Sequence, residues 1–448
     1  MPIPAQYQGR FFYHFTLLDN LPDILRHGFH SPNEQRRLGL LHKSIAIRQI
    51  QDRRATMVVT CGPGGVVHDY IPFYLCKRSS MLLYVVNAKN VDQQHLIYLA
   101  LPISLIDQPH VVYTNASANT DFPPEFFADP QNLRDLDWAA IGSLKWKMAT
   151  DAKKQARMAE VLIYQNVDVR LIDHIIVWND SIRTRVQQIY EQAGLPAPPI
   201  RANAHHYYTK WPAAPEQSLV TGPYFTKRAF EQTVQQISEA PQAAGARFAN
   251  IGGLLDALRA NMANLPETAE LVGLESENEM HVENVGDHTL SVVRALTESN
   301  EFAALDDGAK RIAELAAFLH DIGKGPKARW ASKGGKQQVD PDHPIKSARM
   351  LVRILTQEVV DVEPDEVRVL AKLVCYHDLV GDILGRDRNP EQLEDLAESE
   401  RDLDMLIALG MADMRAVNAG WYGAQADRVG DLRRQVMEKL NSISGIEE

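Results

Sequence analysis

The spacing of apolar residues changes near residue 200, and this change limits the possible folds more than any other feature of the chain. Before it, short apolar runs alternate with helix-like segments, which indicates mixed α and β structure. Proline-rich breaks follow at 195–200 and 211–217. From about residue 225 onward, apolar residues recur only at helical spacing. With 448 residues the chain is too long for one ordinary core. We therefore expect an α+β part followed by an all-α part.

Local patterns give more specific expectations within this frame. Residues 20–29 read as a short helix that ends at Gly28, because glycine commonly follows the last helical residue. The runs 81–88, 161–165 and 171–179 read as buried strands. A helix is expected over 309–319, where the apolar residues that share one face are Ile312, Leu315, Ala316 and Leu319. The expected boundaries are a first domain at 1–212, a connecting segment at 213–245 and a second domain at 246–448.

Charge is distributed unevenly along the chain. Residues 1–200 contain 20 lysines and arginines against 18 acidic residues, and the remainder contains 27 against 40. The first part can therefore approach a polyanion, whereas the second would repel one except at a metal site. The three cysteines fit no disulfide or zinc spacing, and we see neither a signal peptide nor a membrane-spanning stretch. These features favour a cytoplasmic protein with no membrane partner. The oligomeric state is left open.

The segment AFLHDIGKG at 317–325 is the most informative motif of the second part. Its adjacent His320 and Asp321 can both reach one ion lying over a helix end, and an imidazole with a carboxylate suits Mn, Fe, Zn or Mg. His288 in VGDHTLSVV and Asp413 in ALGMADM offer the same chemistry on other apolar helices. A single histidine on an apolar helix is usually a core residue, and a single aspartate is usually solvated. The hypothesis of a metal site therefore depends on the whole set.

This set resembles the HD superfamily of phosphohydrolases, and most closely the HD domains of CCA-adding and related nucleotide-processing enzymes. The resemblance rests on DHTL, LHDIGK, DHPxxSA and LVxxH, in this order over about 276–420. It implies that a nucleotide or phosphate ester binds here, beside one or two divalent ions. A bound cation acidifies water and neutralises a phosphoryl oxygen. A degenerate HD domain that only binds its ligand is the alternative. The implied roles are metal binding by His288, His320, Asp321 and Asp413, binding of a second ion or the phosphate by His343 and His377, and phosphate contact by Lys324.

The first part contains no phosphate-binding glycine loop or catalytic triad, but three segments carry suitable chemistry. In YHFT, His14 and Thr16 occupy alternate positions of an expected strand and point to the same side. IQDRRA presents two adjacent arginines, which suit a pyrophosphate. KKQARMAEVLIY places Glu160 at the start of an apolar strand. A carboxylate before a strand is more often a rim residue, and paired arginines are more often solvated, so these segments alone leave the function open.

The same segments resemble the DarT family of NAD-dependent ADP-ribosyltransferases, which modify thymidine or another base in single-stranded DNA. The resemblance runs in order from about residue 10 to 185, and it is carried by YHFTLLDNLPDILRHGF, IQDRR, GPGGVVHDYIPFYLCKRSSMLLYVVNA, YTNASANTDF, LDW and KKQARMAEVLIY. It implies the α+β ADP-ribosyltransferase fold, a split sheet with an NAD cleft, followed here by the all-α HD domain.

The resemblance also implies roles for individual residues. Glu160 would be the catalytic carboxylate, able to stabilise an oxocarbenium-like ribose and to deprotonate a ring nitrogen of the base. One of Arg53 and Arg54, with Arg54 preferred, would bind the phosphates. The implied contacts to NAD come from His14, Thr16, Asn20 and Tyr70, while Tyr70 and Arg78 would also shape the side of the acceptor base and Asn115 would lie in the substrate loop.

Two hypotheses connect the halves of the chain. The HD domain either reverses or limits the modification, in place of a separate antitoxin, or it processes a nucleotide or the modified product. The first is slightly favoured. Other classes of function stay open: a transferase directed at protein or RNA with an HD nucleotidase, or a regulator that senses nucleotides without catalysis.

Overall fold

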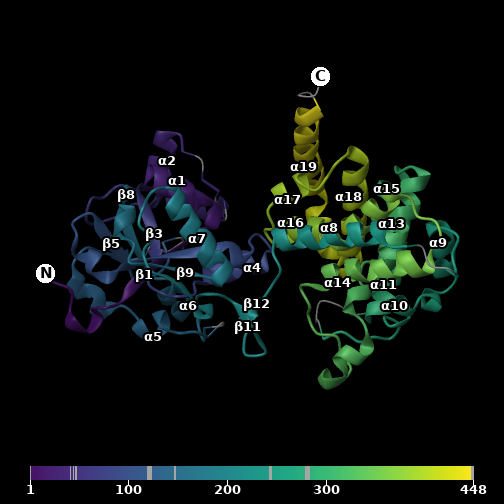
Figure 1. Ribbon diagram of the computed structural model, residues 1–448, viewed down its shortest axis with the longest axis horizontal. Coiled ribbons are helices and arrows are strands. Elements are labelled where there is room, and N and C mark those ends of the chain that lie inside the picture. The colour runs from purple at the N-terminus through teal and green to yellow at the C-terminus, as the bar shows by residue number, and fades with distance from the viewer. Residues whose placement is uncertain are drawn as a thin grey trace. The chain divides into compact units, whose positions relative to one another are not determined.

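The structure is a computed structural model that describes residues 2–40, 42–43, 45, 48–118, 124–145, 148–241, 245–277 and 283–444. It divides into two compact units, Met1–Leu219 and Val220–Glu448. Figure 1 shows strands and helices in the first unit and helices in the second. The expectation of an α+β part followed by an all-α part is confirmed. Among the described residues, no helix combines the length and the apolar character needed to cross a membrane.

The first unit is built on a mixed sheet of eight strands in which only the β9–β10 pair is parallel. The central strands β4 and β7 are buried along almost their whole length, which explains their continuous apolar sequences. The sheet order is β10 (Ile200–Ala202), β9 (His174–Val177), β4 (Leu96–Pro102), β1 (Phe11–Leu17), β3 (Tyr70–Tyr74), β7 (Glu160–Tyr164), β5 (Val111–Thr114) and β6 (Phe126–Phe127).

Helices and two small strand pairs complete the first unit. β2 (Phe29–His30) pairs with β8 (Asn166–Val167), and β11 (Thr209–Lys210) pairs with β12 (Ala214–Ser218). The expected helix at 20–29 is confirmed as α1, which Gly28 ends with a positive φ of 91°. The α-helices are α1 (Leu21–His27), α2 (Pro32–Leu38), α3 (Arg48–Thr56), α4 (Ser80–Asn87), α5 (Trp138–Ile141), α6 (Asp151–Arg157) and α7 (Asp180–Gln192).

One of the three expected strands is wrong. The runs 161–165 and 171–179 contain β7 and β9, but 81–88 forms the helix α4. The side chain of Ser79 caps this helix by accepting a hydrogen bond from the Leu82 amide. The buried positions Leu82, Val85 and Val86 follow helical spacing, which an unbroken apolar run hides from an interpretation based on hydrophobicity.

The second unit is a bundle of helices around one apolar core, with no strand among its described residues. The expected helix at 309–319 is confirmed within α13, and its four predicted apolar positions are all buried. The α-helices are α8 (Pro223–Glu239), α9 (Ile251–Ala260), α10 (Pro266–Ala269), α11 (Val285–Thr297), α12 (Asn300–Ala303), α13 (Asp307–Leu319), α14 (His343–Arg353), α15 (Pro364–Tyr376), α16 (Leu379–Gly385), α17 (Glu391–Glu394), α18 (Glu400–Val417) and α19 (Ala419–Ser444).

The segment 213–245, expected to connect the two domains, is divided between the units. Residues 213–219 include β12 and belong to the first unit. Helix α8 belongs to the second, because its buried Phe230 and Ile237 are part of the helical core.

Candidate active sites

The sheet of the first unit is open between its two middle strands. β1 pairs with β4 along its whole length, but it pairs with β3 only at Tyr13 and Tyr74. His14 and Phe15 point to opposite faces of β1, because successive strand residues alternate, yet both line one cavity of about 350 Å³. The cavity therefore extends through the opening between the strands. Its volume lies within the range of small-molecule sites.

His14 is fixed on the wall of this cleft. Its Nδ1 lies 2.7 Å from the Pro72 carbonyl oxygen, and its ring packs edge-on against Phe29 and Phe73. Burial lowers the pKa of His14 to about 4, so the ring is neutral at neutral pH. Nδ1 donates to the Pro72 carbonyl, and Nε2 is left as the unprotonated nitrogen.

Hydrogen bonds also hold Thr16 and Asn20 in place beside His14. Asn20 Nδ2 donates to Thr16 Oγ1 and to the Lys43 carbonyl, both at 3.0 Å, and Asn20 Oδ1 accepts from the Lys43 amide. Asn20 thereby holds the backbone of Lys43 in place, and Lys43 and His42 both line the cavity. Thr16 also lines the cavity. Asn20 is buried behind these residues and does not line the cavity itself.

Glu160 and Arg54 form a buried pair in which two nitrogens contact two oxygens. Arg54 Nη1 lies 3.1 Å from Glu160 Oε1, and Nη2 lies 3.0 Å from Oε2. Glu160 is fully buried and Arg54 is 6% exposed. The Ala118 amide, at 2.9 Å, and the Ser117 hydroxyl, at 3.3 Å, also donate to Glu160 Oε1. Burial disfavours the charged guanidinium, but the adjacent carboxylate outweighs this effect and raises the pKa of Arg54.

The pair adjoins the cleft through Arg54. Arg54 and Ser117 both contact Glu160 and line the cavity, while Glu160 lies behind them. Its position follows from the sheet, since Glu160 is the first residue of β7 and faces Tyr74 on β3. The Glu160 amide donates to Thr114 Oγ1, which ties the start of β7 to the end of β5.

Sequence reasoning missed two residues of this site. Tyr74 lines the cavity and stacks on Phe15, with ring centroids 5.8 Å apart. Burial, and then the neighbouring Glu160 carboxylate, raise the pKa of Tyr74, so its hydroxyl stays protonated. Ser117 is the other. Both lie within motifs named above, DYIPFY and TNASANT, but no spacing pattern distinguishes them from their neighbours.

The remaining predicted residues occupy different places. Tyr70 lines the cavity and donates to the Gly64 carbonyl at 2.7 Å, and burial raises its pKa to about 12. Arg53 lies on the exposed side of α3.

Arg78 and Asn115 lie elsewhere. Arg78 is buried and donates to the carbonyl oxygens of Tyr207 and Leu144. Asn115 forms hydrogen bonds with Glu125. Neither Arg78 nor Asn115 is among the described residues that line the cleft, so their proposed contacts to the substrate stay predictions. Part of the TNASANT loop, at 119–120, lies outside the described residues.

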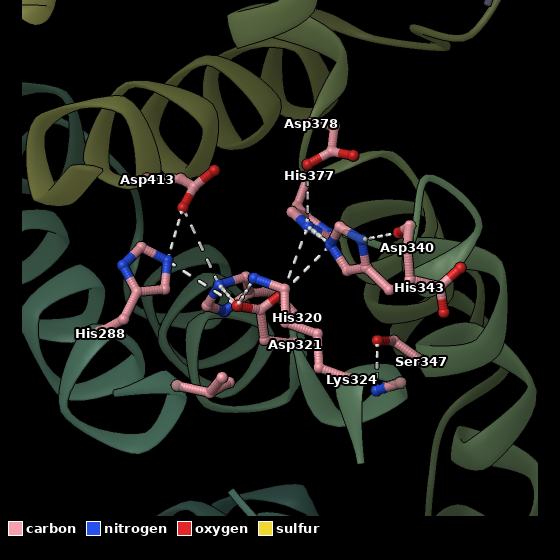
Figure 2. Close-up of polar contacts among 12 residues, drawn as sticks. His288, His320, Asp321, Lys324, Asp340, His343, Ser347, His377, Asp378 and Asp413 are labelled. Atoms are coloured by element: carbon pink, nitrogen blue, oxygen red, sulfur yellow. Dashed lines mark hydrogen bonds and ion pairs between the residues drawn. The ribbon is translucent and has the colours of Figure 1, made fainter. Parts of the chain in front are cut away.

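A second candidate site lies in the helical unit, where the ends of several helices meet (Figure 2). His288 lies on α11 and Asp413 on α18, while His343 begins α14. The other three residues follow the last residue of a helix. His320 and Asp321 come directly after α13, and His377 comes directly after α15. The fold therefore brings together the six predicted metal ligands, and it also places Lys324, the predicted phosphate contact, beside Asp321.

Asp321 is common to two groups of possible metal ligands. His288, His320 and Asp321 form one group, and Asp321, His343 and His377 form the other, with the ligand atoms of each group within 4.8 Å of one another. Asp321 Oδ2 lies 3.3 Å from His320 Nε2, and Oδ1 lies 3.1 Å from His343 Nε2. Each carboxylate oxygen therefore faces a different group, as Figure 2 shows.

Asp413 completes the first group. Its Oδ1 lies 3.0 Å from His288 Nε2 and 4.0 Å from His320 Nε2. Burial raises the pKa of its carboxyl, but the hydrogen bond from His288 and the nearby imidazoles lower it to about 2. Asp413 is therefore ionised at neutral pH and available as a ligand.

Backbone carbonyls orient three of the imidazoles. His320 Nδ1 lies 2.7 Å from the Ala317 oxygen, His343 Nδ1 lies 2.8 Å from the Asp340 oxygen, and His377 Nδ1 lies 2.9 Å from the Val374 oxygen. A carbonyl can only accept, so each Nδ1 carries the proton and each Nε2 is turned toward the cluster. Such hydrogen bonds are usual behind metal-binding histidines.

The donor set fits a cation. His320 Nε2 is buried and forms no hydrogen bond with a described residue, although the carboxylate of Asp321 lies 3.3 Å away. Burial opposes ionisation of Asp321, but His320 and Lys324 outweigh it and hold its pKa well below the usual range. Burial likewise opposes protonation of His377, but Asp378, Asp321 and Asp413 raise its pKa to about 9. The acidic cluster attracts positive charge, and imidazole with carboxylate is a common donor set for Mn, Fe and Zn.

Three residues beside the cluster were missed in the sequence analysis. Asp378 lies 3.1 Å from His377 Nε2, Asp340 bonds to His343 through its carbonyl, and Ser347 Oγ accepts from the Gly323 amide. Lys324, which was predicted, donates to Asp321 Oδ2 at 2.6 Å. A signal existed for Asp378, which follows a predicted ligand directly in LVCYHDL, and for Ser347, which is the serine of DHPxxSA.

Comparisons with known proteins identify a family model for each part of the chain. Residues 13–209 match a family model described as "ssDNA thymidine ADP-ribosyltransferase, DarT", and residues 285–407 match the HD domain model. The chain is 33% identical over 217 residues to a DNA ADP-ribosyl transferase of Thermus aquaticus, covering 47% of this chain and 91% of that protein. It is 34% identical over 192 residues to one of a Thermus species, covering 40% of this chain and 87% of the relative.

Two further comparisons concern a bifunctional enzyme and a solved structure. A bifunctional uridylyltransferase/uridylyl-removing enzyme of Gluconobacter oxydans is 30% identical over 193 residues, which are 39% of this chain and 19% of that protein. The structure of the Thermus sp. 2.9 DarT with ADP-ribosylated single-stranded DNA is 28% identical, with a TM-score of 0.42, and covers 46% of this chain and 99% of its own. The first two relatives, each matched over most of its length, identify the family. The chain therefore belongs to the DarT family of DNA ADP-ribosyltransferases and carries an HD domain in the same polypeptide.

Proposed function

We propose that the first unit transfers ADP-ribose from NAD to a thymidine base of single-stranded DNA. The observation that carries this proposal is the buried Glu160–Arg54 pair on the edge of a cleft that His14 also lines. The description of the matching family model and the names of the relatives support DNA as the acceptor. The co-substrate is NAD, since ADP-ribosyl transfer requires an activated ADP-ribosyl donor.

The reaction exchanges one glycosidic bond for another. The bond between ribose C1 and nicotinamide breaks, and nicotinamide leaves with the electron pair. A bond forms between the same carbon and a ring nitrogen of the base, whose proton passes to Glu160. As the leaving group departs, positive charge develops on the ribose, and an adjacent carboxylate stabilises it. Arg54 counters the negative charge of the pyrophosphate.

In this proposal Glu160 changes its partner during the reaction. Without substrate its carboxylate is bound by Arg54, Ser117 and the Ala118 amide. When Arg54 turns to the phosphates, one carboxylate oxygen becomes available to the ribose. His14 and Thr16, fixed by Pro72 and Asn20, then hold the nicotinamide riboside in the opening of the sheet.

The mass of an oligonucleotide tests the proposal. The full chain is incubated with NAD and a single strand that contains one thymidine, alongside a strand of the same length without thymidine. We expect the mass of an ADP-ribosyl group to be added to the first strand only, and this addition to be lost with Glu160→Gln. Addition to RNA or to protein in a lysate, with the DNA unchanged, would instead support the alternative acceptors and exclude this proposal.

For the second unit we propose a metal-dependent phosphohydrolase. The observation that carries it is Asp321, which faces two groups of possible ligands with its two carboxylate oxygens. This arrangement favours two ions over one. A bound divalent ion would acidify water and neutralise a phosphoryl oxygen. Lys324 would position the phosphate from the side of Asp321.

We further propose that the HD unit limits the modification made by the first unit. A relative whose name combines a transferring with a removing activity offers a parallel for both in one chain. The test supplies a premodified oligonucleotide to the Glu160→Gln protein with Mn, Fe, Zn or Mg. Loss of the whole ADP-ribosyl group that requires His320 supports reversal, in which water cleaves the bond between ribose C1 and the base, whereas loss of AMP alone indicates hydrolysis of the pyrophosphate, as expected of a phosphohydrolase. An unchanged adduct with every metal excludes both.

A further inference from the structure

A basic segment interrupts the acidic sequence of the second unit. Residues 324–336 contain five lysines and arginines and no acidic residue, although the chain from residue 201 onward has an excess of 13 acidic residues. The segment leads from the end of α13 toward α14 and includes the short 3-10 helix η11 (Lys327–Lys333). In Figure 1 it is part of the green lobe below α14. Its charge therefore differs in sign from that of its surroundings.

Hydrogen bonds join the segment to the turn after α13, which carries the proposed metal ligands His320 and Asp321. Trp330 is buried, and its Nε1 donates to the Lys324 carbonyl at 2.7 Å. Arg329 stacks on the Trp330 ring, 4.3 Å from its centroid, and donates to the Gly323 carbonyl. Lys324 in turn contacts Asp321. The basic segment consequently has a fixed place next to the cluster.

Two nearby carboxylates are already paired, whereas Glu275 and Glu277, whose backbones bond to Gln337, form no ion pair with any described residue. Asp321 is held by Lys324, and Asp340 contacts both Arg329 and Lys346. The side chains of Lys327, Lys333 and Lys336 are exposed and form no ion pair with any described residue. Glu270 lies close, but its carboxylate accepts from the backbone amide of Lys327. The three ammonium groups therefore have no ion-pair partner among the described residues, and their side chains are exposed to a ligand.

The cluster is accessible from the residues that flank this segment. Lys324 precedes the exposed stretch and His343 follows it, and their side chains are 11% and 12% exposed, compared with 1% for His320 and Asp321. Asp413 and Asp378 are 19% and 21% exposed, so the edge formed by Lys324 and His343 is one of the sides from which a ligand can reach the cluster. Several exposed ammonium groups on a segment that adjoins the cluster suit a chain of phosphates better than a single one.

We propose that Lys327, Lys333 and Lys336 bind the sugar-phosphate backbone of a single nucleic-acid strand and present it to the HD cluster. The substrate of the HD unit is then part of a polynucleotide, not a free nucleotide. That this strand is the DNA modified by the first unit rests on the function proposed above. The proposed contact between the three lysines and the sugar-phosphate backbone does not rest on that function, because DNA and RNA both contain phosphodiesters.

Chemical footprinting of lysines tests the contact. The full chain is acetylated with and without a DNA strand that lacks thymidine, in the absence of NAD, and the modified peptides are measured by mass spectrometry. We expect the strand to protect Lys327, Lys333 and Lys336, and an equal concentration of phosphate as dAMP to leave them reactive. Lys310, on the opposite end of α13, is the internal control. Equal reactivity with and without the strand, or equal protection by dAMP, overturns the proposal.

A triple substitution adds a quantitative test. Lys327→Gln, Lys333→Gln and Lys336→Gln together should reduce the slope of log K against log salt for strand binding by about 2, since each phosphate contact on a single strand contributes about 0.7. The matched control removes the same charge elsewhere in the unit, with Arg294→Gln, Lys310→Gln and Arg311→Gln, and should leave the slope nearly unchanged. Equal slopes for the two triple variants would contradict the proposal.

Failure of this proposal can be distinguished from failure of the function proposed for the first unit. Transfer to a thymidine strand is measured on the same preparations, and we expect the first triple variant to retain it. If wild-type protein transfers no ADP-ribose but the strand still protects the three lysines, the function proposed for the first unit fails and this one survives. An RNA strand of the same sequence, used in the footprint, shows whether the site distinguishes the two sugars.

Discussion

The buried pair of Arg54 and Glu160, to which we assign the proposed chemistry, should also stabilise the first unit. Removing only the guanidinium leaves a buried carboxylate without its counter-charge, which typically costs about 3–5 kcal/mol. We expect Arg54→Ala to lower the free energy of unfolding of the first unit by this amount, as measured by calorimetry of the full chain. Replacing both residues by methionine should recover most of the loss, because buried ion pairs are often replaceable by apolar residues. Equal losses for the single and double variants would show that the pair is not coupled.

His206 gives the first unit a dependence on pH. Burial, and then Lys77 and His174, lower its pKa to about 3 from the ordinary 6.5. Between these values the unfolded chain binds a proton that the folded chain does not, so stability falls as the pH decreases from 6.5 toward 3. The slope is about 1.4 kcal/mol per pH unit. We expect His206→Asn to reduce the slope by this amount in urea unfolding measured from pH 6.5 to 4.5. An unchanged slope would mean that His206 is protonated in the folded protein.

Helix α4 is the element that the sequence analysis assigned wrongly, because it predicted a strand there. The periodic segments α1 and α13 were predicted correctly, as were the strands β7 and β9. The uniformly apolar run 81–88 was not, because its helical pattern becomes visible only when the buried face is known. The decisive signal is local, namely Ser79 in the capping position.

We therefore expect Ser79→Ala to destabilise the first unit by about 1 kcal/mol through loss of the cap on α4. Thermal unfolding of the full chain measures this effect. Ser143→Ala is the matched control, since Ser143 Oγ accepts from the Lys145 amide in an exposed turn outside any helix. Similar shifts for both variants would indicate that the capping bond contributes no more than a surface contact.

Gly323 determines how closely the turn after α13 approaches α14. A Cβ at this position would lie 2.3 Å from the His343 carbonyl oxygen and 2.5 Å from the Ser347 amide nitrogen, and backbone atoms cannot yield as side chains do. Gly323→Ala should move Asp321 away from His343 and weaken metal binding about 10–100-fold, the range typical of changes behind the ligands. Calorimetric titration with Mn measures the affinity. Gly430→Ala in α19, where a Cβ meets no atom within 4 Å, should bind the metal as the wild type does.

At the scale of the whole molecule, the two sites were not equally predictable. The residues proposed to bind metal in the HD domain could be predicted because each lies on or beside an apolar helix in a characteristic order from His288 to Asp413. The cleft of the first unit depends on contacts that no local pattern contains, such as Arg54 with Glu160, 106 positions apart. That Tyr74 and Ser117 line this cleft is likewise visible only in the folded structure. Site residues on or beside apolar helices are thus easier to predict from sequence than site residues that a split sheet brings together.

Because each unit has its own apolar core, loss of one site should leave the other intact. We expect Glu160→Ala to abolish ADP-ribosyl transfer while the purified chain retains two ions, and Asp321→Ala to lose both ions while transfer continues. Asp321 is the informative position because it faces both ligand groups, whereas His343→Ala should lose only the ion of its own group. Metal content by mass spectrometry and transfer to an oligonucleotide are measured on the same preparations. If His343→Ala removes as much metal as Asp321→Ala, the cluster holds a single ion, and the shared carboxylate has a different role.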